Sequence, residues 1–338
     1  MIRKSLFFCV FILFLTYSCN DNRWTEFDDV NIKNLNIEFI DFDQALFKYS
    51  QSNLQNFINN NYSKNEILDY LFYQCLNLGN PNDSLFYKSV DLFRKDSYIV
   101  DLENQIDRSL RSKLASIQVN LNLRFSKLAF LLKNEPTPKK VFWLNTLFSS
   151  SVFCTQNEIG VGLERYLGSN KKVIQRLPSE QFYQWMKDGM NEDFLIRDIL
   201  VNWIYTHHIL NSNGTLIEEM IQWGKVYYIL YAIYPDLSEN LILRYQNDRF
   251  EWCNQNEEKI WKYIVSQSLV FSKNERDINN FINEGPFTPG LPEKGPDRLG
   301  QYIGWKMVFK YMENHKSKTL EDLLKTSYNT ILQEYQID

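Results

Sequence analysis

The feature that most constrains the fold is a proline- and glycine-rich segment at 284–312 that runs directly into a helical pattern. It reads E-G-P-F-T-P-G-L-P-E-K-G-P-D-R-L-G-Q-Y-I-G-W-K-M-V-F-K-Y-M. Its prolines fix φ and exclude both a helix and a central strand, while its glycines can take the positive φ angles that tight turns need. The pattern predicts a rigid loop up to Asp297, which we expect to be the N-cap of the following helix.

Two glycines in that helix, Gly300 and Gly304, lie four residues apart and therefore share one face. Each glycine costs a helix about 1 kcal/mol relative to alanine, so the pair indicates that another element packs closely against this face. A ligand site at the loop and Arg298 is the alternative interpretation. Asp297, Arg298, Gly300, Gly304 and Trp305 together form a candidate interaction or structural site.

Arg165 is a further candidate because it follows a glycine-bearing turn in an apolar neighbourhood, as Arg298 does. A guanidinium in such a place must find a carboxylate or backbone carbonyls. For both arginines, a structural ion pair and an anion-binding role remain open.

The N-terminus has the pattern of a bacterial lipoprotein signal. Arg3 and Lys4 supply its positive charge, residues 6–15 form an apolar run, and Ser18 precedes Cys19. The apolar run is too short to cross a bilayer, which takes about 20 residues. We therefore expect acylation at Cys19 and attachment of the chain to a membrane through this residue.

The expected domain organisation follows from this signal. Residues 1–18 are the signal peptide, residues 19–36 are polar and form a tether, and residues 37–338 form a single, mostly helical domain. A simple secretory signal with a bystander cysteine is the alternative, since Thr16 stands where such signals usually have leucine.

Composition and charge indicate which kinds of molecule the protein is expected to bind. The chain has 338 residues, of which 44% are hydrophobic, and this is enough to bury a substantial core. Loss of the two basic signal residues takes the formal charge from −4 to −6, and no basic stripe is visible. Nucleic acid is therefore not expected as a partner. Cys75, Cys154 and Cys253 are widely spaced and odd in number, which excludes a disulfide framework.

Hydrophobic periodicity predicts an α+β fold, mostly α-helical with a small antiparallel or mixed sheet. A long helix, or two nearly collinear ones, is expected over 99–132. Another helix should begin at Pro178, and a capping box at Thr215 should begin one that stops at Pro235. A final helix is expected over 319–333. The expected strands are 36–42, 141–148, 151–155 and 159–163.

Known catalytic motifs are missing from the sequence. The only histidines are His207, His208 and His315, and the adjacent pair would point about 100° apart on a helix, which does not suit a zinc site. The sequence contains no H-E-x-x-H, G-x-S-x-G, phosphate-binding loop or dinucleotide fingerprint. We expect no catalytic residues, no metal and no cofactor.

Four segments carry a family resemblance: I-G-V-G-L-E-R-Y-L-G at 159–168, then 216–227, 252–261 and 285–312. In this order behind a lipoprotein signal, they make the chain resemble the gliding motility lipoprotein GldB family of the Bacteroidetes. The resemblance implies a lipid-anchored envelope protein that faces the periplasm and is needed for gliding. Its implied partners are other envelope proteins of gliding and of type IX secretion.

That family is also distantly similar to zinc peptidases, in which an H-E-x-x-H helix is followed by a helix bearing Glu-Gly. In this sequence Trp223-Gly224 stands at the Glu-Gly place, and 198–209 lacks the metal motif. The resemblance therefore implies a degenerate zincin-like scaffold and a non-enzymatic protein that acts through protein contacts. The alternatives are a zincin-derived hydrolase that retains activity, and a periplasmic binder of a small anion at Arg298 and the loop before it.

Overall fold

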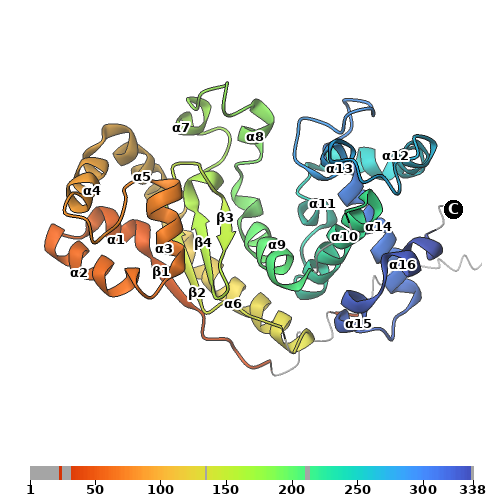
Figure 1. Ribbon diagram of the computed structural model, residues 1–338, viewed down its shortest axis with the longest axis horizontal. Helices are drawn as coiled ribbons and strands as arrows, with labels where there is room; N and C mark the ends of the chain where they lie inside the picture. The colour runs from red at the N-terminus through yellow and green to blue at the C-terminus, as the bar shows by residue number, and fades with distance from the viewer. Residues whose placement is uncertain (1–22, 25–31, 134, 210–213, 336–338) are drawn as a thin grey trace, which may run out of the picture.

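The computed structural model describes residues 23–24, 32–133, 135–209 and 214–335 of the chain (Figure 1). The predicted signal peptide and Cys19 lie outside these residues. The described part is mostly helical and contains one small mixed sheet, so the predicted α+β class is confirmed.

The sheet has the strand order β1-β2-β4-β3 within the described chain. β1 runs parallel to β2, β2 runs parallel to β4, and β3 is antiparallel to β4. The hairpin between β3 and β4 closes where Thr155 donates to the Glu158 carbonyl at 2.9 Å. The strand bounds are β1 Glu38–Asp41, β2 Lys140–Leu144, β3 Val152–Cys154 and β4 Glu158–Gly162.

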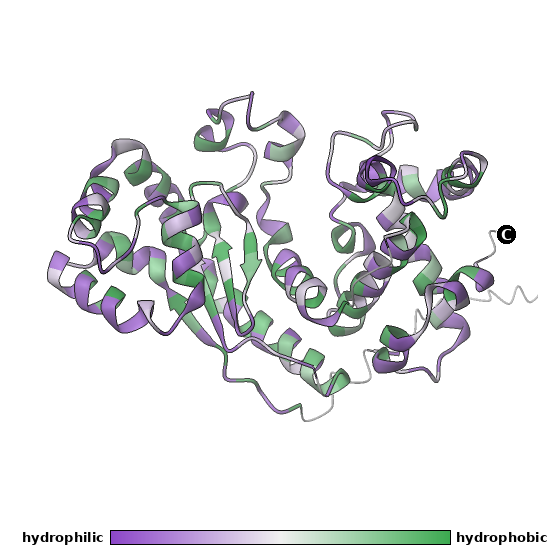
Figure 2. Cartoon of the chain, viewed as in Figure 1, coloured by the Kyte–Doolittle hydropathy of each residue, from purple (hydrophilic) through white to green (hydrophobic). Residues whose placement is uncertain are grey.

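Side-chain alternation along β2 divides the interior into two cores. Val141 and Trp143 belong to the larger core, whereas Phe142 and Leu144 belong to a smaller one on the opposite face. Successive residues of a strand point to opposite faces, so a strand buried on both faces reads as a continuous apolar run. Figure 2 accordingly shows the strands mostly in the hydrophobic colour.

The N-terminal helices cover the face of Phe142 and bury an aromatic cluster there (Figure 1). Phe72 contacts Phe42 and Phe86, with ring centroids 5.8 and 5.0 Å apart. The helices of this group are α1 Phe42–Lys48, α2 Gln51–Tyr62, α3 Glu66–Tyr70, the π-helical turn η2 Leu71–Cys75, α4 Phe86–Lys95 and α5 Ser97–Ser109.

The predicted helical segment 99–132 is two helices, α5 and α6 (Leu114–Leu131), joined by a 3₁₀ turn, η3 (Arg111–Lys113). The turn places Arg111 against four carboxylates. Its guanidinium lies 2.5 Å from Asp41, 3.1 Å from Asp43, 2.7 Å from Glu103 and 3.2 Å from Asp107. The pairs with Asp41 and Asp43 join residues far apart in sequence, and they accompany a break that the helical periodicity does not show.

Helices α10 (Leu216–Ile233) and α14 (Leu299–Asn314) form the centre of the larger core in the C-terminal half. The predicted capping box is present: Thr215 and Glu218 satisfy each other's backbone at the start of α10. The helix ends at Ile233, two residues before Pro235, as expected. The remaining helices here are α11 Glu239–Ile242, α12 Asn247–Ser266, α13 Glu275–Ile282, α15 Leu320–Lys325 and α16 Tyr328–Glu334.

Two helix predictions are wrong. No helix begins at Pro178, because 178–183 forms turns and the next helix begins at Gln184. The expected helix over 319–333 is divided into α15 and α16, since Ser327 accepts from the Thr330 amide and begins a second helix. Between the sheet and α10 lie η4 Leu163–Tyr166, α7 Lys172–Gln175, α8 Gln184–Asp188, η5 Glu192–Phe194 and α9 Leu195–His208.

Trp24, inside the expected tether, is part of the folded body. Its side chain is 5% exposed and belongs to the larger core. The indole donates to the Tyr228 hydroxyl at 3.2 Å, and Lys127 donates to the Trp24 carbonyl at 2.8 Å. The chain therefore contacts the folded body thirteen residues before the expected start of the domain at residue 37.

Candidate functional site

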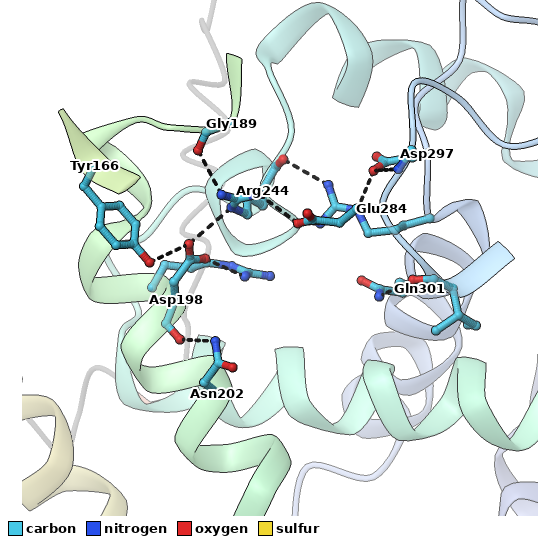
Figure 3. Close-up of polar contacts among 12 residues, drawn as sticks. Tyr166, Gly189, Asp198, Asn202, Arg244, Glu284, Asp297 and Gln301 are labelled. Carbon is cyan, nitrogen blue, oxygen red and sulfur yellow. Dashed lines mark hydrogen bonds and ion pairs between the residues drawn. The ribbon is translucent and has the colours of Figure 1, made fainter. Parts of the chain in front are cut away.

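Two adjoining cavities lie where the sheet half meets the C-terminal helices. Their volumes are about 590 and 180 Å³, and both are lined by Arg165, Arg244, Glu284 and Arg298. Arg165 comes from η4 and Arg244 follows α11, while Glu284 and Arg298 lie in the loop between α13 and α14. Figure 3 shows how polar contacts connect several of these residues. We take the larger cavity, here the arginine cavity, as the candidate site.

Arg298 occupies the N-cap position of α14 with a φ of 53°, in the left-handed region. Its Nε lies 3.0 Å from Asp297, and its Nη2 donates to the Arg244 carbonyl at 3.3 Å. The guanidinium also lies over the Tyr245 ring, 5.2 Å from the centroid. Arg298 is thus buried with an internal carboxylate as its closest charged partner.

Asp297 is not the N-cap of this helix, contrary to the sequence-based expectation. Its carboxylate accepts from the Gly285 amide at 3.0 Å and binds Arg298, so it closes the loop instead. The first helical amide, that of Leu299, donates to the Thr288 hydroxyl at 3.2 Å. Tertiary contacts therefore replace the local cap.

Arg244 is the second arginine here with left-handed backbone, at φ 59°. Its guanidinium lies 3.3 Å from Asp198 and 2.8 Å from Glu284, and it donates to the Gly189 carbonyl at 2.8 Å (Figure 3). Left-handed conformations cost non-glycine residues about 1–3 kcal/mol and persist only where surrounding contacts enforce them. The two carboxylates and the carbonyl provide such contacts for Arg244.

Asp198 connects the two sides of the cavity from its place on α9. Its carboxylate pairs with Arg197 at 2.9 Å and with Arg244, and it accepts from the Tyr166 hydroxyl at 3.1 Å. Burial raises the pKa of Tyr166 well above its usual value, and the Asp198 charge raises it further. Tyr166 is therefore a hydrogen-bond donor to Asp198 at physiological pH.

Glu284 lies at the mouth of the cavity with half of its side chain exposed. Burial of the carboxyl by itself would raise its pKa, but the charges of the surrounding arginines outweigh this and lower the pKa below its usual range. The arginines responsible are Arg244, Arg298, Arg197 and Arg165. Glu284 is consequently an ionised acceptor and a poor proton donor near neutral pH.

The chain matches the family model of gliding motility protein GldB over residues 23–336. It belongs to the GldB family. Searches of curated proteins and of solved structures found no match. Family membership assigns this GldB-family protein to gliding motility. Within the described residues, no helix combines the length and apolar character needed to span a bilayer.

The positions at which the expected resemblance to zinc peptidases would place a metal motif hold other side chains in this GldB-family protein. On α9, Asp198 is bound by arginines and the Asn202 amide donates to the Asp198 carbonyl at 2.9 Å. On α10, Gly224 faces the α14 backbone, and Trp223 lines the arginine cavity. No group of three or more His, Cys, Asp or Glu residues in the described chain is placed to hold a metal ion.

The predicted site residues fall into two groups in the structure. Arg165 and Arg298 line both cavities, and Asp297 lines the smaller one. Gly300 and Gly304 instead face neighbouring backbone: added Cβ atoms would lie 2.8 Å from the Phe281 carbonyl oxygen and 1.7 Å from that of Met220, respectively.

Trp305 lies away from the cavity, in an aromatic cluster with Tyr231 and Phe309, at ring-centroid distances of 5.8 and 5.1 Å. Its indole donates to Glu239 at 3.4 Å. Trp305 therefore belongs to core packing between α10 and α14.

Sequence reasoning missed three site residues, Arg197, Asp198 and Arg244. The first two were visible as a charged pair inside an apolar helical stretch, L-I-R-D-I-L-V-N-W-I. A charged pair on a buried helix face requires partners elsewhere in the fold. Arg244 had no comparable signal, because its role depends on a turn that brings it to α9.

Proposed function

We propose that this GldB-family protein is a lipid-anchored cell-envelope component of gliding motility that acts through protein contacts and not by catalysis. The observation that carries the proposal is the family match over 23–336, behind a lipoprotein-type signal ending at Cys19. We infer that its partners are other envelope proteins of gliding and secretion, and that the folded body faces the periplasm.

The state of the thiols supports a non-catalytic role. Burial raises the pKa of Cys154 to about 12, and it also raises the pKa values of Cys75 and Cys253. Nucleophilic cysteines need a lowered pKa, because the thiolate is the reactive form. These three thiols therefore have the character of inert, packed side chains.

The histidines of α9 also make structural contacts. His207 stacks on Trp203, with ring centroids 3.7 Å apart, and its Nε2 lies 3.0 Å from the Thr155 carbonyl oxygen. His208 lies 3.1 Å from Glu135, and burial lowers its pKa. Neither histidine lines the arginine cavity, so neither is placed to act as a general base there.

The test uses a strain that lacks the gene, complemented with the full chain or with Cys19→Ser. We expect the wild-type chain to restore spreading over a surface and to partition with lipoproteins into detergent. Cys19→Ser should be exported, accumulate to a similar level, lose detergent partitioning and fail to restore spreading. Cys75→Ser is the matched control, since it removes a thiol from the folded body and leaves the signal intact.

Full gliding by a Cys19→Ser protein that no longer partitions into detergent would remove the anchor from the proposal. Catalysis is tested separately on the purified full chain in detergent. Zinc near one equivalent per chain, together with a lower melting temperature on chelation, would support the hydrolase alternative.

A further inference from the structure

The arginine cavity has the size and composition of a small-molecule site. Its volume of about 590 Å³ lies within the range of roughly 300–1,000 Å³ typical of ligand pockets. Its lining combines guanidinium groups with aromatic side chains of α9 and α10, namely Tyr205, Trp223 and Tyr227, and the Arg197 guanidinium lies over the Tyr227 ring, 5.4 Å from the centroid. Tyr205 and Trp223 stack with ring centroids 4.7 Å apart.

Arg197 lines this cavity and has one N–H hydrogen-bond donor that no described residue accepts from. Only 6% of its side chain is exposed, its Nη1 pairs with Asp198 at 2.9 Å, and its Nε donates to the Ile242 carbonyl at 2.9 Å. Its Nη2 makes no hydrogen bond of normal geometry to any residue that the structure describes. A buried charged donor is costly to leave without an acceptor, so Arg197 has capacity for one further acceptor, which a ligand could supply.

Arg165 is the second under-used cation. Its only hydrogen bond among the described residues is a long one, 3.4 Å, to the Phe148 carbonyl, and no carboxylate of the described chain lies within 4 Å of it. It nevertheless lies near enough to Glu284 to help lower the pKa of that carboxyl. Arg165 and Arg197 thus line the same cavity, and both have N–H groups that make no hydrogen bond to the described residues.

The other two arginines of the cavity are already bound and hold its shape. Asp198 links Arg197 to Arg244, and Glu284 accepts from Arg244 at 2.8 Å. Arg298 is held by its neighbour Asp297 and by the Arg244 carbonyl. Such a network keeps guanidinium groups in place before a ligand arrives, which reduces the cost of binding.

The charge balance selects the class of ligand. Three of the four arginines that line this cavity have carboxylate partners: Asp198 and Glu284 pair with Arg197 and Arg244, and Asp297 pairs with Arg298. Arg165 has no such partner among the described residues, and its single positive charge is neutralised by a monoanion and exceeded by a phosphate dianion. Planar carboxylates also match the paired donors of a guanidinium.

We propose that the arginine cavity binds a small monocarboxylate, whose carboxylate lies on Arg165 and Arg197 and whose apolar body lies against Trp223 and Tyr205. This site goes beyond the proposed function, because it requires neither the lipid anchor nor a protein partner. It makes this envelope protein responsive to a soluble organic acid.

The test is calorimetric titration of the full chain in detergent with acetate and benzoate, beside benzamide and inorganic phosphate at equal ionic strength. We expect one benzoate per chain, weaker binding of acetate, and no binding of the neutral amide. Arg165→Gln and Arg197→Lys should each weaken benzoate binding by about tenfold or more, the equivalent of one charge-assisted hydrogen bond. Arg197→Lys retains the positive charge beside Asp198 but loses the Nε donor to the Ile242 carbonyl, so its melting temperature is measured beside its binding.

Arg276→Gln is the matched control, because Arg276 is exposed on α13 and does not line the cavity. It should bind benzoate like the wild type. The proposal is overturned if neither acid binds at millimolar concentration, if phosphate binds more tightly than both acids, or if the Arg165 and Arg197 variants match Arg276→Gln.

Discussion

Replacement of Gly304 by alanine tests whether close backbone packing of α10 on α14 stabilises the fold. A Cβ at this position would lie 1.7 Å from the Met220 carbonyl oxygen, whereas ordinary contact begins at 3.4 Å. The helices would have to separate by about 1.7 Å along that line, because a backbone carbonyl cannot rotate away. The contact is reciprocal: a Cβ at Gly224 would lie 2.1 Å from the Gly304 carbonyl oxygen.

The expected magnitude follows from two opposing effects. Overpacking of a core typically costs about 1–3 kcal/mol, and a backbone obstacle places Gly304→Ala at the upper end of that range. Alanine has a higher helix propensity than glycine, which stabilises the helix by about 1 kcal/mol. We therefore expect a net loss of about 2 kcal/mol, and a melting temperature lower by about 3 °C for a chain of this size.

The assay is thermal unfolding followed by circular dichroism, with Gly285→Ala as the control. A Cβ at Gly285 would meet only the Phe287 carbonyl oxygen, at 3.6 Å, so this variant should melt at or slightly above the wild-type temperature. A Gly304→Ala protein that melts at or above the wild-type temperature would refute the packing argument, since propensity alone would then decide the outcome.

Three further predictions concern charged side chains. Burial raises the pKa of Asp43 well above its usual value and Glu103 raises it further, so wild-type stability should fall relative to Asp43→Asn as pH rises from 4 to 8 in urea unfolding. The Lys48 hydrogen bond lowers the Asp107 pKa, so the stability of the wild type relative to Asp107→Asn should instead fall as pH drops from about 5 to 2, and the same pH dependence for both variants would contradict this. Arg298→Ala leaves Asp297 buried without its partner and should lose about 3–5 kcal/mol in the same assay, whereas exposed Arg276→Ala should stay within about 0.5 kcal/mol of the wild type. Equal stability of these two variants would show that the Arg298 pair is not structural.

The sequence predicted correctly those helix and strand features that depend on residues close together in the chain. The capping box at Thr215 lies where expected, because helix capping involves only residues near in sequence. The strand expected over 141–148 begins where predicted but ends at Leu144, since Leu147 and Phe148 have positive φ angles of 51° and 65° and cannot continue it. The stop at Pro235 has a local cause as well, since proline cannot continue a helix.

The Asp297 cap failed because its carboxylate is taken by tertiary partners. Aspartate is a good N-cap in isolation, yet here the Gly285 amide and Arg298 occupy it, and Thr288 caps the helix from eleven residues away in sequence. The arginine cavity escaped prediction for a related reason. Arg197 and Arg244 are separated by 47 positions in sequence, and nothing in the sequence shows that the fold brings them to the same carboxylate.

The docking of Trp24 limits how far the body can stand from a bilayer. Five peptide units separate Cys19 from Trp24, and a fully extended chain spans at most about 3.6 Å per residue, which gives roughly 18 Å. An acylated Cys19 would therefore keep Trp24 within roughly 18 Å of the lipid. Lys133, Lys316 and Lys318 line the same surface hollow as Trp24 and would face anionic headgroups. Such a short connection would keep this surface turned toward the membrane, and partners would then approach from the opposite side of the molecule.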